Sequence, residues 1–331
     1  MDDTLHAVDC RWLLALYAII PISIAVVALD ILWLDHWLMD NFLPSDPQRW
    51  AFWTVVFGLP HIIASTLTMA DREYLGYYRR RLGIPLLAFA AITTAGFLGP
   101  QPLSYSLLFL FLAFYTIYHV LAQQLGLTLM MMGVPPDRVF LAWKWLAIFA
   151  GFAIYVIVYG KARFSHLTIG PLPLFDVMSA IAGGFVIVMT ILAFRLSKRA
   201  RYPIGKWYLW GNVAMLTSAF WINEVGYTVF VVMIPRIIHD LTAFSVYITH
   251  DRNRNKTGPR NLLYRLTRIT RLPAFLVLPL VSVAIAYPLT TNQHHTAIGI
   301  AVLTVSFLHY YFEGFIWRGD TPHKRHLGFR R

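Results

Sequence analysis

Ten apolar stretches, separated by short polar segments, constrain what this chain can fold into. Each is roughly as long as a helix that crosses about 30 Å of hydrocarbon. The chain is 58% hydrophobic and only 13% charged, whereas soluble domains average about 25% charged residues. The sequence therefore predicts an all-α, polytopic integral membrane protein, a helical bundle with spans near residues 12–34, 50–70, 84–99, 104–131, 139–160, 173–194, 207–222, 226–249, 273–290 and 296–317.

Basic residues are distributed unevenly among the segments between these spans. With a cytoplasmic N-terminus, 23 of the 28 Lys and Arg residues fall on the inner side, and only Arg49, Lys161 and Arg163 fall outside. Because cytoplasmic loops are enriched in Lys and Arg, we expect both termini in the cytoplasm and the protein in the bacterial inner membrane. The net charge of +12 thus reports topology and does not indicate nucleic-acid binding.

No composition shift, repeat or low-complexity stretch divides the chain, so we expect one transmembrane domain over residues 1–331. The longest cytoplasmic loop, residues 251–272, ends in apolar residues at helical spacing with arginines between them. These residues are Leu262, Leu266, Ile269 and Leu272, with Arg265, Arg268 and Arg271. The pattern is typical of an amphipathic helix lying on anionic lipid at the inner interface; the alternative is a docking surface for a soluble partner.

Four of the 12 histidines lie inside apolar spans, where ionisable side chains are costly and usually functional. They are His61, His119, His239 and His309, all on helices predicted to run from outside to inside. Counting residues to the cytoplasmic ends places three of them about 14–18 Å from that side, with His119 deeper unless its helix ends early. Imidazoles from separate helices form buried metal or haem sites, so we expect such a site in the cytoplasmic half of the bundle.

Two of these histidines have a polar residue one helical turn later. His309 and Glu313 are four residues apart and therefore reach the same side of their helix. The spacing suits a metal ligand whose carboxylate neighbour is a second ligand or a base. His119 and Gln123 repeat this spacing with a neutral partner.

Charged and aromatic residues next to the histidines suggest supporting roles. Asp240 follows His239 and can hold the second ring nitrogen of a histidine ligand. Arg236 lies one turn before Asp240, and either neutralises it or meets a substrate carboxylate. Tyr310, beside His309, can line a pocket.

The remaining histidines are expected to be peripheral. His250 lies 11 residues after His239, about 16 Å along a helix, which is too far to share one centre. His323 and His326 fall in the C-terminal tail, where we expect them to be solvated, as we do for His294 and His295 in a loop.

Four short windows of the sequence resemble the bacterial Brp/Blh family of membrane-embedded β-carotene dioxygenases. They are Gly58-Leu-Pro-His61, the isolated His119, Ile238-His239, and Leu303-Thr-Val-Ser-Phe-Leu-His309 followed by Glu313-Gly-Phe-Ile-Trp-Arg318. The resemblance implies a multi-helical fold, Fe(II) held by His61, His119 and His239, and cleavage of a polyene by dioxygen. Where the family carries a second histidine one turn after His239, this chain has Ala243, so His309 or Glu313 would have to supply the missing ligand.

The residues favour a non-haem iron oxygenase that acts on a lipophilic substrate, with Glu313 and Asp240 as catalytic groups. The single cysteine, Cys10, excludes a cysteine-rich metal centre, and the clustered histidine boxes of membrane di-iron desaturases are missing. Two alternatives remain open. One is a haem-binding electron carrier, and the other is a proton-coupled transporter that uses the buried His, Asp and Glu side chains. The sequence names neither the substrate nor an electron donor.

Overall fold

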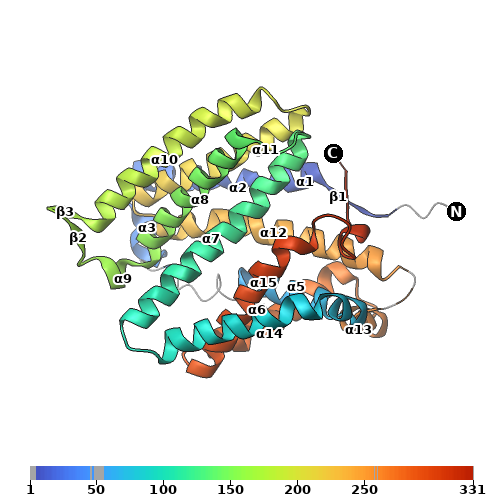
Figure 1. Cartoon of the computed structure of the whole chain (residues 1–331). Coiled ribbons are helices and arrows are strands. Elements are labelled where there is room, and N and C mark those ends of the chain that lie inside the picture. Colours follow the sequence, from blue (N-terminus) through green and yellow to red (C-terminus); the bar gives the residue numbers. More distant parts are fainter. Residues whose placement is uncertain (1–4, 45–46, 48–55, 257, 259, 331) are drawn as a thin grey trace. The chain divides into compact units, whose positions relative to one another are not determined.

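The structure is a computed structural model that describes residues 5–44, 47, 56–256, 258 and 260–330. This part of the chain is predominantly helical, with two short two-stranded ladders (Figure 1). Within it, seven helical segments are long and apolar enough to cross a membrane. The predicted helical class is confirmed, and these helices have the length and apolar composition expected of membrane spans. The beginning of the predicted span 50–70 lies outside the described residues.

The seven segments coincide with seven of the predicted spans. They are Cys10–Trp33, made of α1 (Cys10–Ala15), η1 (Leu16–Ala18) and α2 (Ile19–Trp33), then α6 (Arg72–Leu98), α7 (Leu103–Met132), α8 (Arg138–Tyr159), α10 (Leu174–Ser197), α12 (Thr228–Arg254) and α15 (Thr296–Ile316).

The other three predicted spans also contain helices, namely α5 (Leu59–Met69), α11 (Pro203–Glu224) and α14 (Ala274–Thr291). Helix α5 has 11 residues, far fewer than the about 20 that a full crossing needs, and the apolar part of α14 is also short. The structure therefore does not establish a count of ten crossings.

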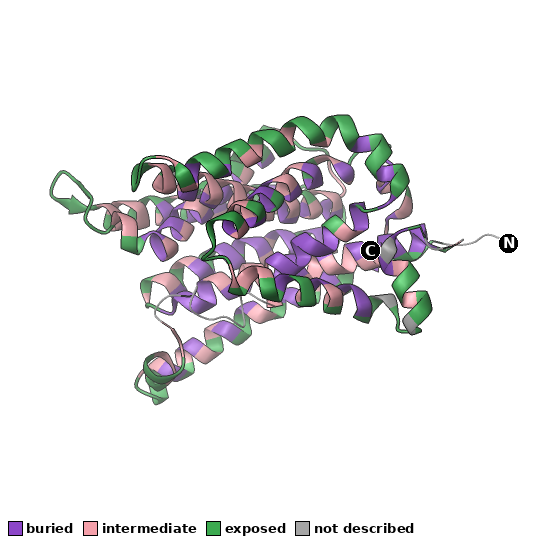
Figure 2. Ribbon diagram, turned by 90° about the horizontal axis from the view of Figure 1, so that it is seen from below, coloured by how far each residue is buried: buried purple, intermediate pink, exposed green. Residues whose placement is uncertain are grey.

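The outward sides of the long helices are apolar. Ile84 and Leu87 of α6 are 77% and 72% exposed, and Ile187, Ile191 and Phe194 of α10 are also well exposed. Large exposed apolar surfaces of this kind mark contact with a membrane or a partner, because water disfavours them. Figure 2 shows the same division on many helices, which present one buried and one exposed side.

The chain forms two compact units, each built from segments that are far apart in the sequence. The first unit comprises residues 1–10, 51–112 and 240–330, and the second comprises residues 11–50 and 113–239. The boundaries fall inside α7 and α12, so each of these helices contributes one part to each unit. The single domain expected over residues 1–331 stays a prediction.

In the second unit, α8 packs against α10 and α11, and α11 also packs against α2. Small buried residues on α8 allow this close approach; they are Ala147, Ala150, Gly151 and Ala153. A Cβ atom on Gly151 would lie 3.1 Å from Ile117 Cγ2. The unit also holds α3 (Trp37–Asn41), α9 (Lys161–Phe164) and an antiparallel ladder of β2 (Thr168–Ile169) and β3 (Leu172–Pro173).

In the first unit, α5 packs against α14 and α15, and α15 also packs against α6. The predicted amphipathic helix in 251–272 is present as α13 (Leu262–Thr270), which packs against α14. Its Leu263 is buried, whereas Ile269, Arg265 and Arg268 are exposed. The loop is shorter than predicted because α12 continues to Arg254.

The two ends of the described chain meet in the first unit. Strand β1 (Ala7–Asp9) pairs in parallel with β4 (Gly328–Arg330), which follows the short helix η3 (Lys324–His326). The side chain of Asn253, at the end of α12, bridges both ends. Its Oδ1 accepts from the His6 backbone N–H at 2.8 Å, and its Nδ2 donates to the backbone oxygens of His6 and His326.

The tail histidines are not solvated, contrary to the expectation from sequence. His323 is 0% exposed, and its ring stacks on those of Tyr74 and His250, with centroids 3.9 and 5.0 Å apart. Its Nδ1 lies 3.3 Å from Tyr78 Oη. Burial lowers the pKa of His323 to about 2, and the positive charge of Arg254 adds to the effect. The tail folds back onto α6 and α12, which no local sequence pattern shows.

Arg254 joins the end of α12 to the start of α6. Its Nε donates to Asp71 Oδ2 at 3.0 Å and its Nη2 donates to Glu73 Oε2 at 2.6 Å. The guanidinium also lies over the ring of Tyr74, 4.7 Å from the centroid. Asp71 is the N-cap of α6, where it accepts from the Glu73 backbone N–H. Arg254 and Asp71 are both buried, so this ion pair is shielded from water.

We expect acid to loosen the C-terminal tail. A detached tail protonates His323 at its ordinary pKa of 6.5, whereas the docked tail does so only near 2. Docking is therefore fully stable above pH 6.5 and weakens as the pH falls, by about 1.4 kcal/mol per pH unit for one proton. At pH 5, hydrogen exchange of the β4 amides, corrected for the intrinsic rate, should be about 30-fold faster. His323→Gln should remove most of this pH dependence. If the exchange rate of the variant still rises with acid as in the wild type, another group, such as half-buried His326, is responsible.

Arg254→Met should destabilise the first unit by about 3–5 kcal/mol, because it leaves the buried carboxylate of Asp71 without its cation. Arg260 is the matched control, since it also approaches Glu73 but its side chain is 49% exposed. Arg260→Met should change stability by less than about 1 kcal/mol. Chemical unfolding of the detergent-solubilised protein measures both, and equal effects would contradict the special role of the buried pair.

Candidate metal centre

The motif Gly58-Leu-Pro-His61 forms the start of α5. Gly58 has a φ of +87°, which favours glycine, and Pro60 lies in the first turn, where a missing N–H is tolerated. His61 is buried in that turn, and its Nδ1 lies 2.9 Å from Asp240 Oδ1 on α12. The backbone N–H of Gly58 donates to Asp240 Oδ2 at 2.5 Å. One carboxylate therefore binds the N-terminus of α5 and orients the imidazole.

His309 is held by a residue of α5 that no sequence pattern indicated. Ser65 lies one turn after His61, and its Oγ is 2.6 Å from His309 Nδ1. The hydroxyl of Ser65 donates to the backbone oxygen of Ile62 at 2.7 Å. Because a hydroxyl has only one hydrogen, Ser65 Oγ then accepts from His309 Nδ1–H. His309 is thereby held in the tautomer that leaves Nε2 unprotonated.

The Nε2 atoms of His61 and His309 face each other at 3.2 Å. The carboxylate of Asp240 favours a proton on His61 Nδ1, so both Nε2 atoms present lone pairs. Two lone pairs at this distance repel unless a cation or a proton lies between them. Neighbouring imidazole ligands about 2.1 Å from one metal have nitrogens about 3.0–3.4 Å apart. The pair thus has the protonation and spacing of two ligands of a single metal ion.

Glu313 brings a carboxylate to the same side of His309, as its spacing predicted. Its Oε2 lies 3.9 Å from His309 Nε2, and both side chains are buried. The two acidic residues therefore take different places: Asp240 is at the Nδ1 side of His61 and Glu313 is near the Nε2 atoms. Two imidazoles and one carboxylate form the donor set that holds Fe(II) in non-haem oxygenases and leaves positions open.

The other two predicted histidines form a second pair, in the second unit. His119 on α7 and His239 on α12 are buried, with ring centroids 5.1 Å apart and planes at 82°. The rings of His61 and His309 have a similar arrangement, at 5.0 Å and 70°. The structure therefore describes two histidine pairs, one in each unit. A single centre that contains all four stays a prediction.

The remaining residues singled out from the sequence have varied places. The ring of Tyr310 lies beside His309, with centroids 5.6 Å apart, as expected for a residue that lines the site. Gln123 is half-buried on α7, and its neighbour Gln124 accepts a hydrogen bond from Tyr17 Oη at 3.2 Å. Arg236 lines a cavity of the second unit.

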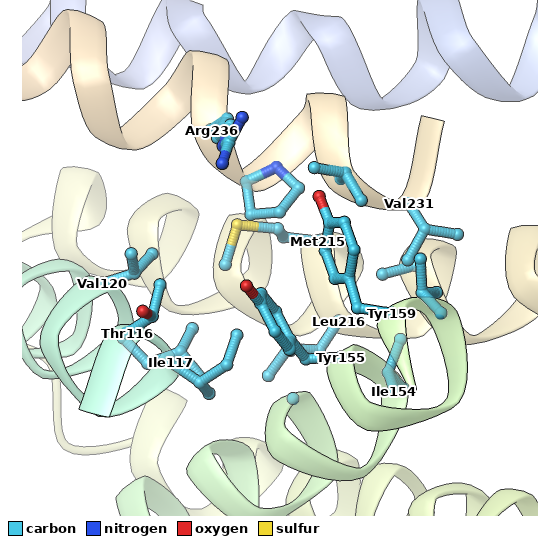
Figure 3. Close-up of a pocket in the computed structure, with 16 residues that line it drawn as sticks. Thr116, Ile117, Val120, Ile154, Tyr155, Tyr159, Met215, Leu216, Val231 and Arg236 are labelled. Atoms are coloured by element: carbon cyan, nitrogen blue, oxygen red, sulfur yellow. The ribbon is translucent and has the colours of Figure 1, made fainter. Parts of the chain in front are cut away.

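That cavity lies among α7, α8, α11 and α12. Figure 3 shows Tyr155 and Tyr159 of α8 along its wall, Met215 and Thr116 near them, and Arg236 at one end. The two tyrosines are four residues apart on α8, a spacing that could have indicated one shared face. Aromatic residues are common in every span, so this pair does not stand out in the sequence.

Comparison of the chain with protein-family models, with curated proteins and with solved structures finds no match. The resemblance of four windows to the Brp/Blh family therefore stays an expectation. Function has to follow from the chemistry of the described residues.

Ser65→Ala should lower the affinity for Fe(II) or Zn²⁺ by about 10- to 100-fold, since residues that orient a histidine ligand have effects of this size. Ser306→Ala is the matched control, because Ser306 is also buried and its hydroxyl donates to the helix oxygen of Val302. Titration of metal against a competing chelator measures both variants. Equal metal affinities of the Ser65→Ala and Ser306→Ala variants would show that Ser65 does not orient a metal ligand.

Proposed function

We propose that this protein is a membrane-embedded non-haem iron oxygenase that acts on a lipophilic substrate with dioxygen. One observation carries the proposal: the Nε2 atoms of His61 and His309 converge beside Glu313 while Asp240 and Ser65 hold the two Nδ1 atoms. This is the donor set and the ligand orientation that such a centre requires.

Each residue would have a separate role at such a centre. His61 and His309 would hold Fe(II), which supplies open positions for binding and activating dioxygen. Glu313 completes the donor set or holds a proton near the reacting atoms. Asp240 keeps His61 oriented, and the ring of Phe312, 5.5 Å from that of His309, helps to exclude water.

Dioxygen and a lipophilic substrate are the reactants that fit this setting. A dioxygenase places both oxygen atoms in the product and needs no external electrons. A monooxygenase would need two electrons and two protons from a separate donor. A carotenoid-like polyene is one substrate of the first kind, and the motif resemblance supports it; another lipid is equally compatible with the apolar surroundings.

The proposed setting is the bacterial inner membrane, with both termini in the cytoplasm. The pairing of β1 with β4, reinforced by Asn253, supports termini on the same side. Helix α13 would rest on anionic lipid through Arg265 and Arg268, with exposed Ile269 in the interface.

The spacing of the first histidine pair does not favour bis-histidine haem. Opposite ligands of one iron, each at about 2 Å, have nitrogens about 4 Å apart with the porphyrin plane between them. The Nε2 atoms of His61 and His309 are only 3.2 Å apart. That distance fits neighbouring positions on a metal, which is the arrangement of a non-haem site.

Metal analysis with an absorption spectrum tests the proposal. The wild type, purified in detergent without chelator, should contain about one iron per chain and show no Soret band. His61→Ala/His309→Ala should lose the iron because it removes two of the three donors. His294→Ala/His295→Ala is the matched control, since both residues are exposed in a loop, and it should keep the iron.

Two outcomes would decide against this proposal. A Soret band would favour a haem protein, and no metal in the wild type would favour transport or a scaffold role. His119→Ala/His239→Ala tests the sequence prediction that the second pair belongs to the same centre. Full iron content in that variant would limit the ligands to the first unit.

A further inference from the structure

Near the end of α12, a phenol, an imidazole and a carboxylate form a buried chain of hydrogen bonds. Tyr74 Oη lies 3.0 Å from His250 Nε2, and His250 Nδ1 lies 2.9 Å from Asp251 Oδ1. Each of the three residues is at most 1% exposed. Because the carboxylate of Asp251 accepts from Nδ1–H, the unprotonated nitrogen of His250 is Nε2. That nitrogen therefore accepts the phenolic hydrogen of Tyr74.

The carboxylate of Asp251 is firmly held beside His250. Its Oδ2 accepts hydrogen bonds from Thr68 Oγ1 and from Asn261 Nδ2, both at 3.3 Å. Donors thus face both carboxylate oxygens. Asp251 is placed to balance a positive charge on His250, so that the imidazole can take up the proton of Tyr74.

Packed aromatic side chains fill the space between Tyr74 and the candidate metal centre of the same unit. The ring of Phe312 lies 5.5 Å from that of His309, and Phe312 belongs to the same buried cluster as Tyr74. Trp317 directly follows α15, two turns and about 12 Å along the axis after His309. The ring of Trp317 lies 5.6 Å from that of His250. Electrons tunnel through packed protein, so this packing couples the surroundings of His309 to Tyr74.

A second row of rings leads from Tyr74 to the surface. The ring of His323 lies 3.9 Å from that of Tyr74 and 5.5 Å from that of Tyr78. The ring of Tyr78 lies in turn 4.8 Å from that of Tyr77. Tyr77 is 54% exposed, whereas Tyr74 and Tyr78 are buried. Ring contacts therefore connect the buried phenol to an exposed one.

We propose that Tyr74 is a redox-active tyrosine, which gives one electron to the iron centre and passes its phenolic proton to Nε2 of His250. The proposal rests on the oxygenase function and adds a protective role to it, because a centre that reacts with dioxygen without substrate would otherwise oxidise its own ligands. The products are a neutral tyrosyl radical, the His250 imidazolium and a centre reduced by one electron. One electron from a soluble thiol, entering at Tyr77, and the proton from His250 then restore Tyr74.

Burial and charge favour a redox role for Tyr74 over nucleophilic catalysis. A phenol that is 0% exposed offers no access to a substrate, but an electron needs none. The guanidinium of Arg254 lies over the ring of Tyr74, 4.7 Å from its centroid, and disfavours a positively charged phenol radical. Loss of the electron therefore requires loss of the proton, and His250 is the base that accepts it.

Flash oxidation of the metal-free protein tests the proposal without iron or dioxygen. The full-length protein is kept in detergent above pH 6.5, where the tail stays docked, and is illuminated with ruthenium tris-bipyridine and persulfate. Electron paramagnetic resonance then detects tyrosyl radicals. The wild type should form a long-lived neutral radical that is hydrogen-bonded to an imidazolium, and Tyr74→Phe should lose this signal.

Tyr247→Phe is the matched control for the loss of a buried phenol. Tyr247 is also buried, and its ring lies 6.0 Å from that of Trp317. Its hydroxyl has no hydrogen-bond partner among the described residues, so it lacks a base. Tyr247→Phe should therefore keep the radical signal. A wild-type signal in Tyr74→Phe would overturn the proposal.

His250→Gln tests the proton acceptor, and it decides the matter if unfolding temperatures show that Tyr74→Phe does not fold. An amide can accept the hydrogen bond of Tyr74 but cannot take its proton. Formation of the radical should therefore slow about 100-fold or more, the size of effect expected for the loss of a general base. Formation at the wild-type rate would overturn the role of His250.

Tyr77→Phe tests the route to the surface. The sensitiser is soluble, so the oxidising equivalent should enter at Tyr77, and the variant should give a lower yield of the Tyr74 radical. Tyr287→Phe is the control, because Tyr287 on α14 is similarly exposed, at 59%, and it should give the wild-type yield. Equal yields from the two variants would overturn the entry at Tyr77.

The redox role and the oxygenase proposal fail in different ways. A chain that binds no iron but forms the Tyr74 radical would contradict the oxygenase proposal alone. A chain that holds iron through His61 and His309 but forms no radical at Tyr74 would contradict only the redox role.

Discussion

One carboxylate, that of Asp240, supports the rest of the candidate site. It accepts the backbone N–H of Gly58 at the start of α5 and faces Nδ1 of His61. A buried charge is costly unless hydrogen bonds and the positive end of a helix compensate it, and here both are provided by α5. Without Asp240, α5 would lose the anion at its N-terminus, and His61 would lose the partner that directs its Nε2 toward His309.

The two ring nitrogens of each histidine have separate tasks in the first unit. The Nδ1 atoms are engaged by protein groups, Asp240 for His61 and Ser65 for His309, and these contacts set the tautomers. The Nε2 atoms lie 3.2 Å apart near the carboxylate of Glu313. A shared cation would account for this short distance between two unprotonated nitrogens. Preorganisation of this kind allows a metal to bind without rearrangement of the helices.

A proton pathway along α12 is less compatible with the packing than a local reaction centre. The described chain contains a second buried polar group at the end of α12, where His250 contacts Asp251 and Tyr74. Between Asp240 and His250, however, Ala243 and Tyr247 belong to an apolar cluster. A relay along α12 itself would have to cross that apolar layer.

The sequence by itself determined the helices, their membrane-spanning character and the shared face of His309 and Glu313. These follow from local periodicity, which acts over a few residues. The tertiary structure decided that Asp240 reaches α5, that Ser65 sets the tautomer of His309, and that the tail histidine His323 is buried. It also showed that α5 is too short for a full crossing. The contacts of Asp240 with Gly58 and of Ser65 with His309 join residues 182 and 244 positions apart. Their pairing depends on which helix faces pack together, which hydropathy and spacing do not encode.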